Sequence, residues 1–195
     1  WQSFGQEFIE PELLNFIDDI PNEGIYFDLG ASTGIFSIYA AAKGNTTYCF
    51  EPEATNFNIL NRNAYLNKAM IAGNFNAFNI AVSNKLSLDT MFMKKFEASA
   101  HDKILGQSMA RDGKEVFQAD YEQRVLAISL DEFCALENIW PTDIKIDIDG
   151  AELDAIEGMT NTLKSSSLKR IFFEISEVEE SSLKALEIVK GFGFN

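Results

Sequence analysis

The amino-acid sequence predicts a single α/β domain over residues 1–195, built on a doubly wound, mostly parallel sheet. Short apolar segments typical of buried strands alternate along the chain with segments of helical spacing. A glycine-rich loop at 28–34 follows the first of these strands and leads into a helix. Strands that alternate with helices imply a parallel sheet covered on both faces, and such a sheet binds ligands beyond the carboxyl ends of its strands.

The first part of the chain predicts three helices and three strands in alternation. Apolar residues recur at roughly helical spacing in each predicted helix, and each predicted strand is a short apolar run. Gly44 follows the second helix and is expected to be its C′ residue. The helices are predicted at 6–20, 34–43 and 54–67, and the strands at 25–27, 46–50 and 74–82.

The middle of the chain departs from this pattern. Residues 86–93 alternate apolar and polar side chains, as in a strand with one solvated face. Residues 94–115 are polar, and residues 117–128 are expected to return as a further strand. We therefore expect a lid or loop insertion at about 91–124, since loops of this length often carry function.

The last third of the chain returns to alternating strands and helices. Ser129 is expected to cap a helix as its N-terminal residue, with Glu132 as its partner in a capping box. Further strands are predicted at 143–148 and 168–175, and further helices at 150–158 and 181–190.

Composition and charge narrow the classes of function. The formal net charge is −14, which disfavours a nucleic-acid partner because phosphates require positive charge. No segment approaches the roughly 20 consecutive apolar residues of a membrane span, so we expect no membrane partner. Two cysteines, Cys49 and Cys134, are too few for a disulfide framework and fit a reducing cytoplasm. The sequence carries no indication of oligomeric state.

The loop after the first strand has the composition of a ligand-binding loop. Gly30 and Gly34 permit sharp turns and a close approach of the backbone, and the helix that follows presents free N–H groups. Asp28 would repel a pyrophosphate and better suits a cationic or hydroxyl-rich ligand. Glu51 ends the next strand, where a carboxylate can accept hydrogen bonds from ribose hydroxyls. The same four residues are also compatible with capping and turn formation alone.

The chain resembles the FkbM family of methyltransferases. The most specific match is Lys145-Ile146-Asp147-Ile148-Asp149-Gly150-Ala151-Glu152, although the family usually has Glu where this chain has Asp149. The other matching segments are 27–34, 50–52, 60–67, 79–83, 129–133 and 173–175.

The resemblance implies a class I methyltransferase fold, which is Rossmann-like, with S-adenosyl-L-methionine as the methyl donor. It implies an oxygen acceptor on a small molecule, sugar or glycan. The cofactor-binding residues that it implies are Asp28, Gly30, Ala31, Ser32, Thr33, Gly34, Glu51, Pro52 and Asp147, with Ala81 near the adenine. The fold normally ends in a β-hairpin, and the sequence stops where that hairpin is expected to begin, so we expect the hairpin to be truncated or to lie in a longer chain.

Three residues are candidates for acid–base catalysis. Asp147 is expected at a strand end beside the transferring methyl group, sharing one side of the strand with Lys145 and Asp149. Glu174 ends a neighbouring strand, and His101, the only histidine, lies in the predicted lid. Each is also compatible with a structural or solvated role. We expect no metal site, because a second pair of metal ligands is not evident.

Two other functions remain open. The same fold could serve as a non-catalytic cofactor-binding domain of a larger biosynthetic protein. A nicotinamide-dependent oxidoreductase would use a related sheet, but the glycine spacing of the loop and the charge of Asp28 argue against it.

Overall fold

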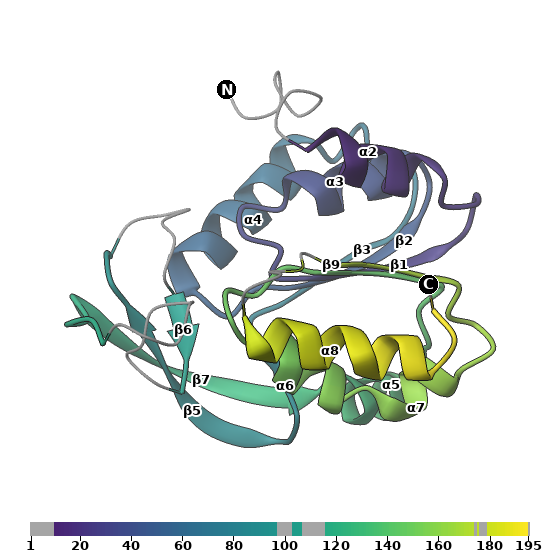
Figure 1. Cartoon of the computed structure of the whole chain (residues 1–195). Coiled ribbons are helices and arrows are strands. Elements are labelled where there is room, and N and C mark those ends of the chain that lie inside the picture. Colours follow the sequence, from purple (N-terminus) through teal and green to yellow (C-terminus); the bar gives the residue numbers. More distant parts are fainter. Residues whose placement is uncertain (1–9, 97–102, 107–115, 174, 176–178, 195) are drawn as a thin grey trace.

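The computed structural model describes residues 10–96, 103–106, 116–173, 175 and 179–194, and it contains two sheets (Figure 1). The larger sheet is five-stranded and parallel, with the strand order β3-β2-β1-β8-β9. Its strands are β1 (Ile25–Leu29), β2 (Thr46–Phe50), β3 (Phe75–Phe78), β8 (Asp143–Ile146) and β9 (Arg170–Phe173). The doubly wound, mostly parallel fold predicted from the sequence is therefore confirmed.

Helices cover both faces of the parallel sheet (Figure 1). One layer consists of α2 (Pro11–Asp18), α3 (Ile35–Ala42) and α4 (Ala54–Leu66). The other consists of α5 (Leu130–Glu137), α6 (Glu152–Glu157), α7 (Thr160–Lys164) and α8 (Glu180–Gly191). Because the strands are parallel, their carboxyl ends lie at one edge of the sheet, where the loops after β1, β2 and β8 meet.

A second sheet lies beside this edge, with the order β4-β7-β5-β6. Its strands are β4 (Ala81–Ser83), β5 (Ser87–Met93), β6 (Lys103–Leu105) and β7 (Tyr121–Ser129). The predicted strand at 86–93 is confirmed as β5, and the strand predicted at 117–128 is β7. The segment expected as a loop, 94–115, contributes β6, which pairs antiparallel with β5. Parts of the predicted lid at 91–124 therefore belong to a sheet, and its action as a lid stays a prediction.

The strand predicted at 74–82 is wrong, because two strands in different sheets replace it. β3 ends at Phe78, and β4 begins at Ala81 and pairs with β7 instead of β2. The Asn79 side chain between them donates hydrogen bonds to the backbone carbonyls of Glu51 and Pro52, at 2.8 and 2.9 Å. An apolar run indicates that a segment is buried, but it does not indicate which strand that segment pairs with.

The segment predicted as a strand at 143–148 is shorter than expected. β8 ends at Ile146, and Asp149 and Gly150 turn the chain with φ angles of 44° and 85°. Asp149 therefore does not continue the alternation of Lys145 and Asp147, which corrects the expectation that the three share one side. The helix α7 was not predicted. The Asp131 carboxylate accepts hydrogen bonds from backbone N–H groups at the start of α7, an interaction between distant residues that the sequence does not reveal.

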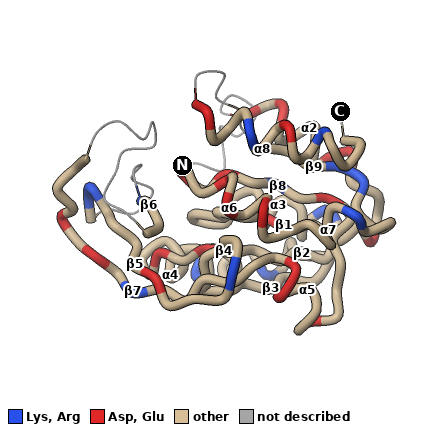
Figure 2. The backbone as a smooth tube through the Cα atoms, turned by 60° about the horizontal axis from the view of Figure 1, so that its bottom comes forward, with Lys and Arg blue, Asp and Glu red and all other residues tan. Residues whose placement is uncertain are grey.

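Local signals for helix ends are confirmed. Ser129 and Glu132 form the predicted capping box at the start of α5, with both reciprocal hydrogen bonds present. Gly44 follows α3 with a φ of 101°, as expected of a C′ glycine. No helix in the described ranges is long and apolar enough to cross a membrane. Asp and Glu positions occur in both helix layers and in the second sheet, so negative charge is spread over the molecule (Figure 2).

An aromatic cluster joins the parallel sheet to α5. The Phe133 ring packs edge-on against the rings of Phe50 and Phe78, with centroids 4.7 and 4.9 Å apart. It also packs edge-on against Phe27 and Tyr48, at 6.0 and 6.1 Å. Because these four rings lie on three adjacent strands, one helical side chain anchors α5 across the centre of the sheet.

We expect Phe133→Ala to lower the free energy of unfolding by about 3–5 kcal/mol, since it removes a buried ring and leaves a cavity. Leu136→Ala in the same helix is the matched control, because Leu136 is 77% exposed and should cost less than about 0.5 kcal/mol. Denaturant titration of both variants measures the difference. Equal losses would show that the cluster does not anchor α5.

Candidate cofactor and active site

The glycine-rich loop after β1 is held to the end of β2. The backbone N–H groups of Gly30 and Ala31 both donate to the Phe50 carbonyl, each at 3.0 Å, and the Gly34 N–H donates to the Ala31 carbonyl at 2.8 Å. Gly30, Ser32 and Gly34 have φ angles of 80°, 50° and 82°. Three left-handed residues in five positions fold the loop into a compact turn, and α3 begins directly after it.

Gly30 also lies against the chain that follows β8. A Cβ atom added at Gly30 would be 1.8 Å from the Asp147 carbonyl oxygen. The absence of a side chain therefore lets the loop after β1 and the loop after β8 pack against each other. The sequence predicted that Gly30 permits a turn, but it could not show this second contact.

A buried charge network lies beneath the loop. The Lys145 ammonium group is 3.1 Å from Asp28 Oδ1 and 3.5 Å from Asp147 Oδ2, and it donates a hydrogen bond to the Gly30 carbonyl at 2.9 Å. Asp28 also accepts a hydrogen bond from the Ser37 hydroxyl in α3. Burial lowers the pKa of Lys145, but the carboxylates of Asp28 and Asp147 outweigh it, and the pKa lies above its ordinary value. Lys145 therefore stays charged and links the two predicted site carboxylates.

The two carboxylates differ in exposure. Asp28 is 1% exposed and is enclosed by the loop, Lys145 and Ser37, whereas the Asp147 side chain is 45% exposed. Asp147 is therefore the member of this network that a ligand can reach. The position of Asp28 fits a role in holding Lys145 and the loop.

Glu51 lies at the end of β2 with its carboxylate oriented by the backbone. Its two oxygens accept hydrogen bonds from the Ser32 N–H at 2.7 Å and the Glu53 N–H at 2.8 Å. Burial raises the pKa of Glu51 to about 7, against the lowering effect of these two N–H groups and of Lys103. A carboxylate oxygen has more than one acceptor site, so Glu51 can still accept hydrogen bonds from a ligand.

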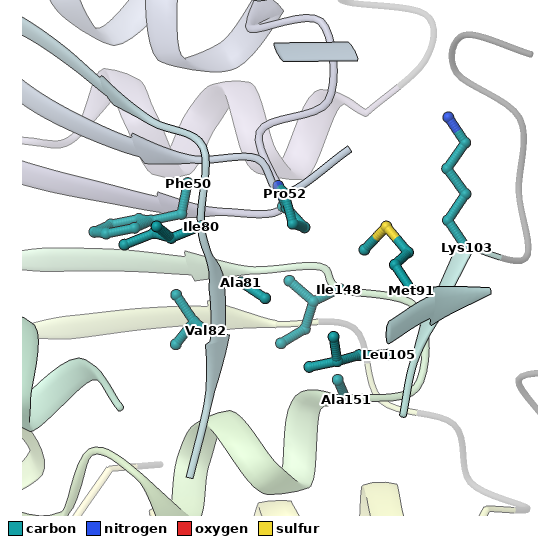
Figure 3. A pocket seen from close by; sticks show the side chains of 11 residues that line it. Phe50, Pro52, Ile80, Ala81, Val82, Met91, Lys103, Leu105, Ile148 and Ala151 are labelled. Carbon is teal, nitrogen blue, oxygen red and sulfur yellow. The ribbon is translucent and has the colours of Figure 1, made fainter. Parts of the chain in front are cut away.

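An apolar cavity opens at the end of β2, where it is lined by Phe50 and Pro52, the residues on either side of Glu51 (Figure 3). Met91 on β5 and Leu105 on β6 lie on one side of it, and Ala81 on β4 and Ile148 after β8 lie on the other. Its lining consists of Gly30, Phe50, Pro52, Ile80, Ala81, Val82, Met91, Lys103, Leu105, Ile148 and Ala151. The predicted residues Gly30, Pro52 and Ala81 are thus brought together at the strand ends.

A larger cavity of about 350 Å³ borders the charge network. It is lined by Glu10, Lys145, Ile146, Asp147 and Phe172. Asp147 and Lys145 therefore lie next to a space large enough for part of a small molecule.

The remaining predicted site residues are Thr33, Glu174 and His101. Thr33 is buried, and its carbonyl accepts a hydrogen bond from the Asn63 side chain of α4 at 2.9 Å. Glu174 and His101 lie outside the described residues, so their catalytic roles stay predictions. Within the part of the chain that the structure describes, no group of three His, Cys, Asp or Glu side chains is arranged to hold a metal ion.

Sequence reasoning missed three residues at this edge. Asn79 lies in a segment that resembles the FkbM family, but its hydrogen bonds to the loop after β2 were not predicted. Glu53 caps α4 by accepting hydrogen bonds from the N–H groups of Thr55 and Asn56. Lys103 comes from the polar segment expected as a loop, and nothing in its sequence context points to the site.

Comparison with known families and structures agrees with this geometry. The profile of the methyltransferase FkbM domain family matches residues 28–195. Comparison with curated protein sequences gives no match.

Several solved structures have a similar fold. Methyltransferase FkbM from Methylobacillus flagellatus KT is 16% identical with a TM-score of 0.57, and the alignment covers 86% of this chain and 37% of that one. Precorrin-6y C5,15-methyltransferase from Geobacter metallireducens GS-15 is 13% identical with a TM-score of 0.51, covering 95% and 70%. Magnesium protoporphyrin IX methyltransferase from Synechocystis PCC 6803, solved with bound S-adenosylmethionine, is 10% identical with a TM-score of 0.51, covering 98% and 70%.

At these identities the likeness shows the fold, which is that of class I methyltransferases. The chain spans little more than a third of the length of the Methylobacillus protein.

We expect Gly30→Ala to lower the free energy of unfolding by about 3 kcal/mol, because a left-handed residue gains a Cβ and that Cβ collides with the Asp147 backbone. Gly44→Ala is the matched control. Gly44 also has a φ angle in the left-handed region, but no atom lies within 4 Å of its added Cβ. Gly44→Ala should therefore lower the free energy of unfolding by about 1–2 kcal/mol, which is the cost of the φ angle alone. Denaturant titration compares them, and equal losses would contradict the close contact.

Proposed function

The chain belongs to the FkbM methyltransferase family, and from this premise we propose that it transfers a methyl group from S-adenosyl-L-methionine to a hydroxyl oxygen of a sugar, glycan or small natural product. The observation that carries the proposal is the position of Glu51 between Phe50 and Pro52, two residues that line the apolar cavity. A buried carboxylate with oriented oxygens and an adjacent apolar slot suit the ribose and the base of one nucleoside.

The residues at the strand ends fit this cofactor. Glu51 would accept hydrogen bonds from the ribose hydroxyls, and the cavity lined by Pro52, Ala81 and Ile148 would hold the adenine once a side chain at its border moves. The loop of residues 30–34 and Asp147 would hold the methionine part. When bound, the sulfonium supplies an electrophilic methyl group and leaves as a neutral thioether.

The protein's own contribution is mainly alignment of the acceptor with that methyl group, because displacement at carbon depends strongly on the geometry of attack. Asp147 is partly exposed and borders the cavity of about 350 Å³, where it can accept a hydrogen bond from the acceptor hydroxyl and take its proton. Lys145 orients the Asp147 carboxylate from 3.5 Å, and Asp28 holds Lys145 in place. Glu174 and His101 stay alternative candidates for the base.

The location and partners of the protein remain part of the proposal. Both cysteines, Cys49 and Cys134, are free and buried, which fits the cytoplasm. We propose a small-molecule or glycan acceptor as the substrate, with neither nucleic acid nor a membrane as a partner.

The first test is binding of S-adenosylhomocysteine to the full chain, followed by turnover with a panel of sugars and hydroxylated natural products. We expect saturable binding by isothermal titration calorimetry and methylation of at least one acceptor. Absence of binding would refute the proposal. Binding without turnover on any acceptor would favour the alternative, a non-catalytic cofactor-binding domain.

We expect Asp147→Asn to lower the rate of methyl transfer at saturating S-adenosyl-L-methionine about 10²-fold or more. The amide keeps the shape of the side chain but cannot take a proton. Asp149→Asn is the matched comparison, because it neutralises a carboxylate two residues away in the same loop. Equal losses in both variants would assign the effect to the charge of the loop and not to Asp147.

We expect the affinity for S-adenosylhomocysteine to weaken as pH falls through about 7, because protonation of Glu51 removes an acceptor for the ribose hydroxyls. If only the ionised form binds, affinity at pH 6 should be about tenfold lower than at pH 8. Glu53 and Lys103 are the charged groups that bear on this carboxylate. Titration calorimetry at several pH values measures the dependence, and Glu51→Gln should abolish it.

The stability of the unliganded protein should increase as pH falls, whereas its affinity for S-adenosylhomocysteine should decrease. The pKa of Glu51 rises from its ordinary value of 4.5 to about 7 in the folded state, so its contribution to stability is fully present below pH 4.5 and is lost as pH rises through 7. Thermal unfolding of the unliganded protein over this range separates this effect from ligand binding.

A further inference from the structure

The second sheet is hydrogen-bonded to the loop that carries Glu51. The Gln123 side chain on β7 donates to the Pro52 carbonyl at 2.7 Å and accepts from the Ala54 N–H at 3.0 Å. Lys103 on β6 places its ammonium group 3.0 Å from Glu53 Oε2. Three consecutive residues of the loop, 52–54, therefore contact side chains that come from the second sheet.

The ion pair between Lys103 and Glu53 is buried. The side chain of Lys103 is 7% exposed and that of Glu53 is 1% exposed. Such a pair contributes little stability beyond that of apolar residues of the same shape, since desolvation offsets the attraction. The ion pair does fix the position of the Glu53 carboxylate. That carboxylate also accepts hydrogen bonds from the N–H groups of Thr55 and Asn56 and so fixes the start of α4.

Glu53 connects this ion pair to Glu51. The backbone N–H of Glu53 donates to Glu51 Oε1 at 2.8 Å. The position of that N–H depends on where the Glu53 side chain is held, and Lys103 and the start of α4 hold it from two sides. A charge on β6 is thus linked through one residue to the carboxylate assigned to the ribose.

The strands β5 and β6 also line the apolar cavity. The side chains of Met91, Lys103 and Leu105 border it (Figure 3). Lys103 has an apolar stem that can lie along the cavity while its ammonium group reaches Glu53. The cavity is only about 30 Å³, so a purine ring would require movement of a side chain at its border, and Met91 is long and flexible.

We propose that Lys103 is a positioning residue for nucleoside binding, acting through Glu53 on Glu51, and that β5 and β6 form one wall of the cofactor site. This inference rests on the proposed function. It assigns to the second sheet a share of cofactor affinity in addition to any contact with the acceptor.

The test compares S-adenosylhomocysteine binding by the full chain and its variants. Lys103→Met keeps the apolar stem and removes the charge, and we expect about tenfold weaker binding. Lys103→Arg keeps the charge and should stay within about threefold of the unmodified protein. Lys43→Met is the matched control, because Lys43 is paired with Asp18 at the surface, with side-chain exposures of 33% and 43%, and its loss should leave affinity unchanged.

Two further measurements distinguish positioning from general destabilisation. Lys103→Met leaves the Glu53 carboxylate without its cation. The double variant Lys103→Met with Glu53→Gln removes both charges and should recover part of the melting temperature but not the affinity, because Gln keeps only one of the two oxygens that cap α4. In addition, Lys103 lowers the pKa of Glu51, so Lys103→Met should shift the pH midpoint of binding upward. A simple packing defect would weaken binding equally at all pH values.

The outcomes separate the two proposals. If the unmodified protein binds no S-adenosylhomocysteine, the proposed function fails. If it binds and the Lys103→Met and double variants bind equally well with an unchanged pH midpoint, the proposed function stands and the role of Lys103 is refuted. Weaker binding by the double variant at a recovered melting temperature, together with the upward shift of the pH midpoint in Lys103→Met, supports the inference.

Discussion

The buried ammonium group of Lys145 is the interaction on which the site depends. A charge that is 3% exposed is costly unless several partners replace its water, and here Asp28, Asp147 and the Gly30 carbonyl do so. These partners come from β1, from the loop after β1 and from the loop after β8. One side chain on β8 therefore fixes the relative positions of the glycine-rich loop and the exposed carboxylate of Asp147.

The close contact of Gly30 with Asp147 adds a steric constraint to this electrostatic one. The ion pairs draw the two loops together, and the missing Cβ allows their backbones to meet. The charges are not sufficient alone, since a side chain at Gly30 would separate the loops even with the charges in place. The geometry of the proposed methyl-transfer site thus follows from one cation on β8 and one glycine directly after β1.

A second group of contacts joins the parallel sheet to the smaller sheet. The loop of residues 51–54 is held by Asn79 after β3, by Gln123 on β7 and by Lys103 on β6. Glu51 is oriented from the glycine-rich loop by the Ser32 N–H and from its own loop by the Glu53 N–H. Its raised pKa reflects the burial that this enclosure requires. The nucleoside end of the site therefore depends on both sheets, whereas the end near Asp147 depends on the parallel sheet alone.

The sequence by itself determined the alternation of strands and helices, the capping box at Ser129, the glycine-rich loop and the positions of Glu51 and Asp147 at strand ends. These features follow from local chemistry: apolar periodicity, the backbone freedom of glycine and side-chain capping act over a few residues. Only the tertiary structure decided that Asn79 divides a predicted strand between two sheets, that Asp131 caps α7 and that Lys103 lies against Glu53. The residues in these contacts are 27 to 50 positions apart in the chain, and their pairing is set by which strands become neighbours. A local pattern cannot carry that information, because the same polar side chain fits a solvated loop or a buried ion pair equally well.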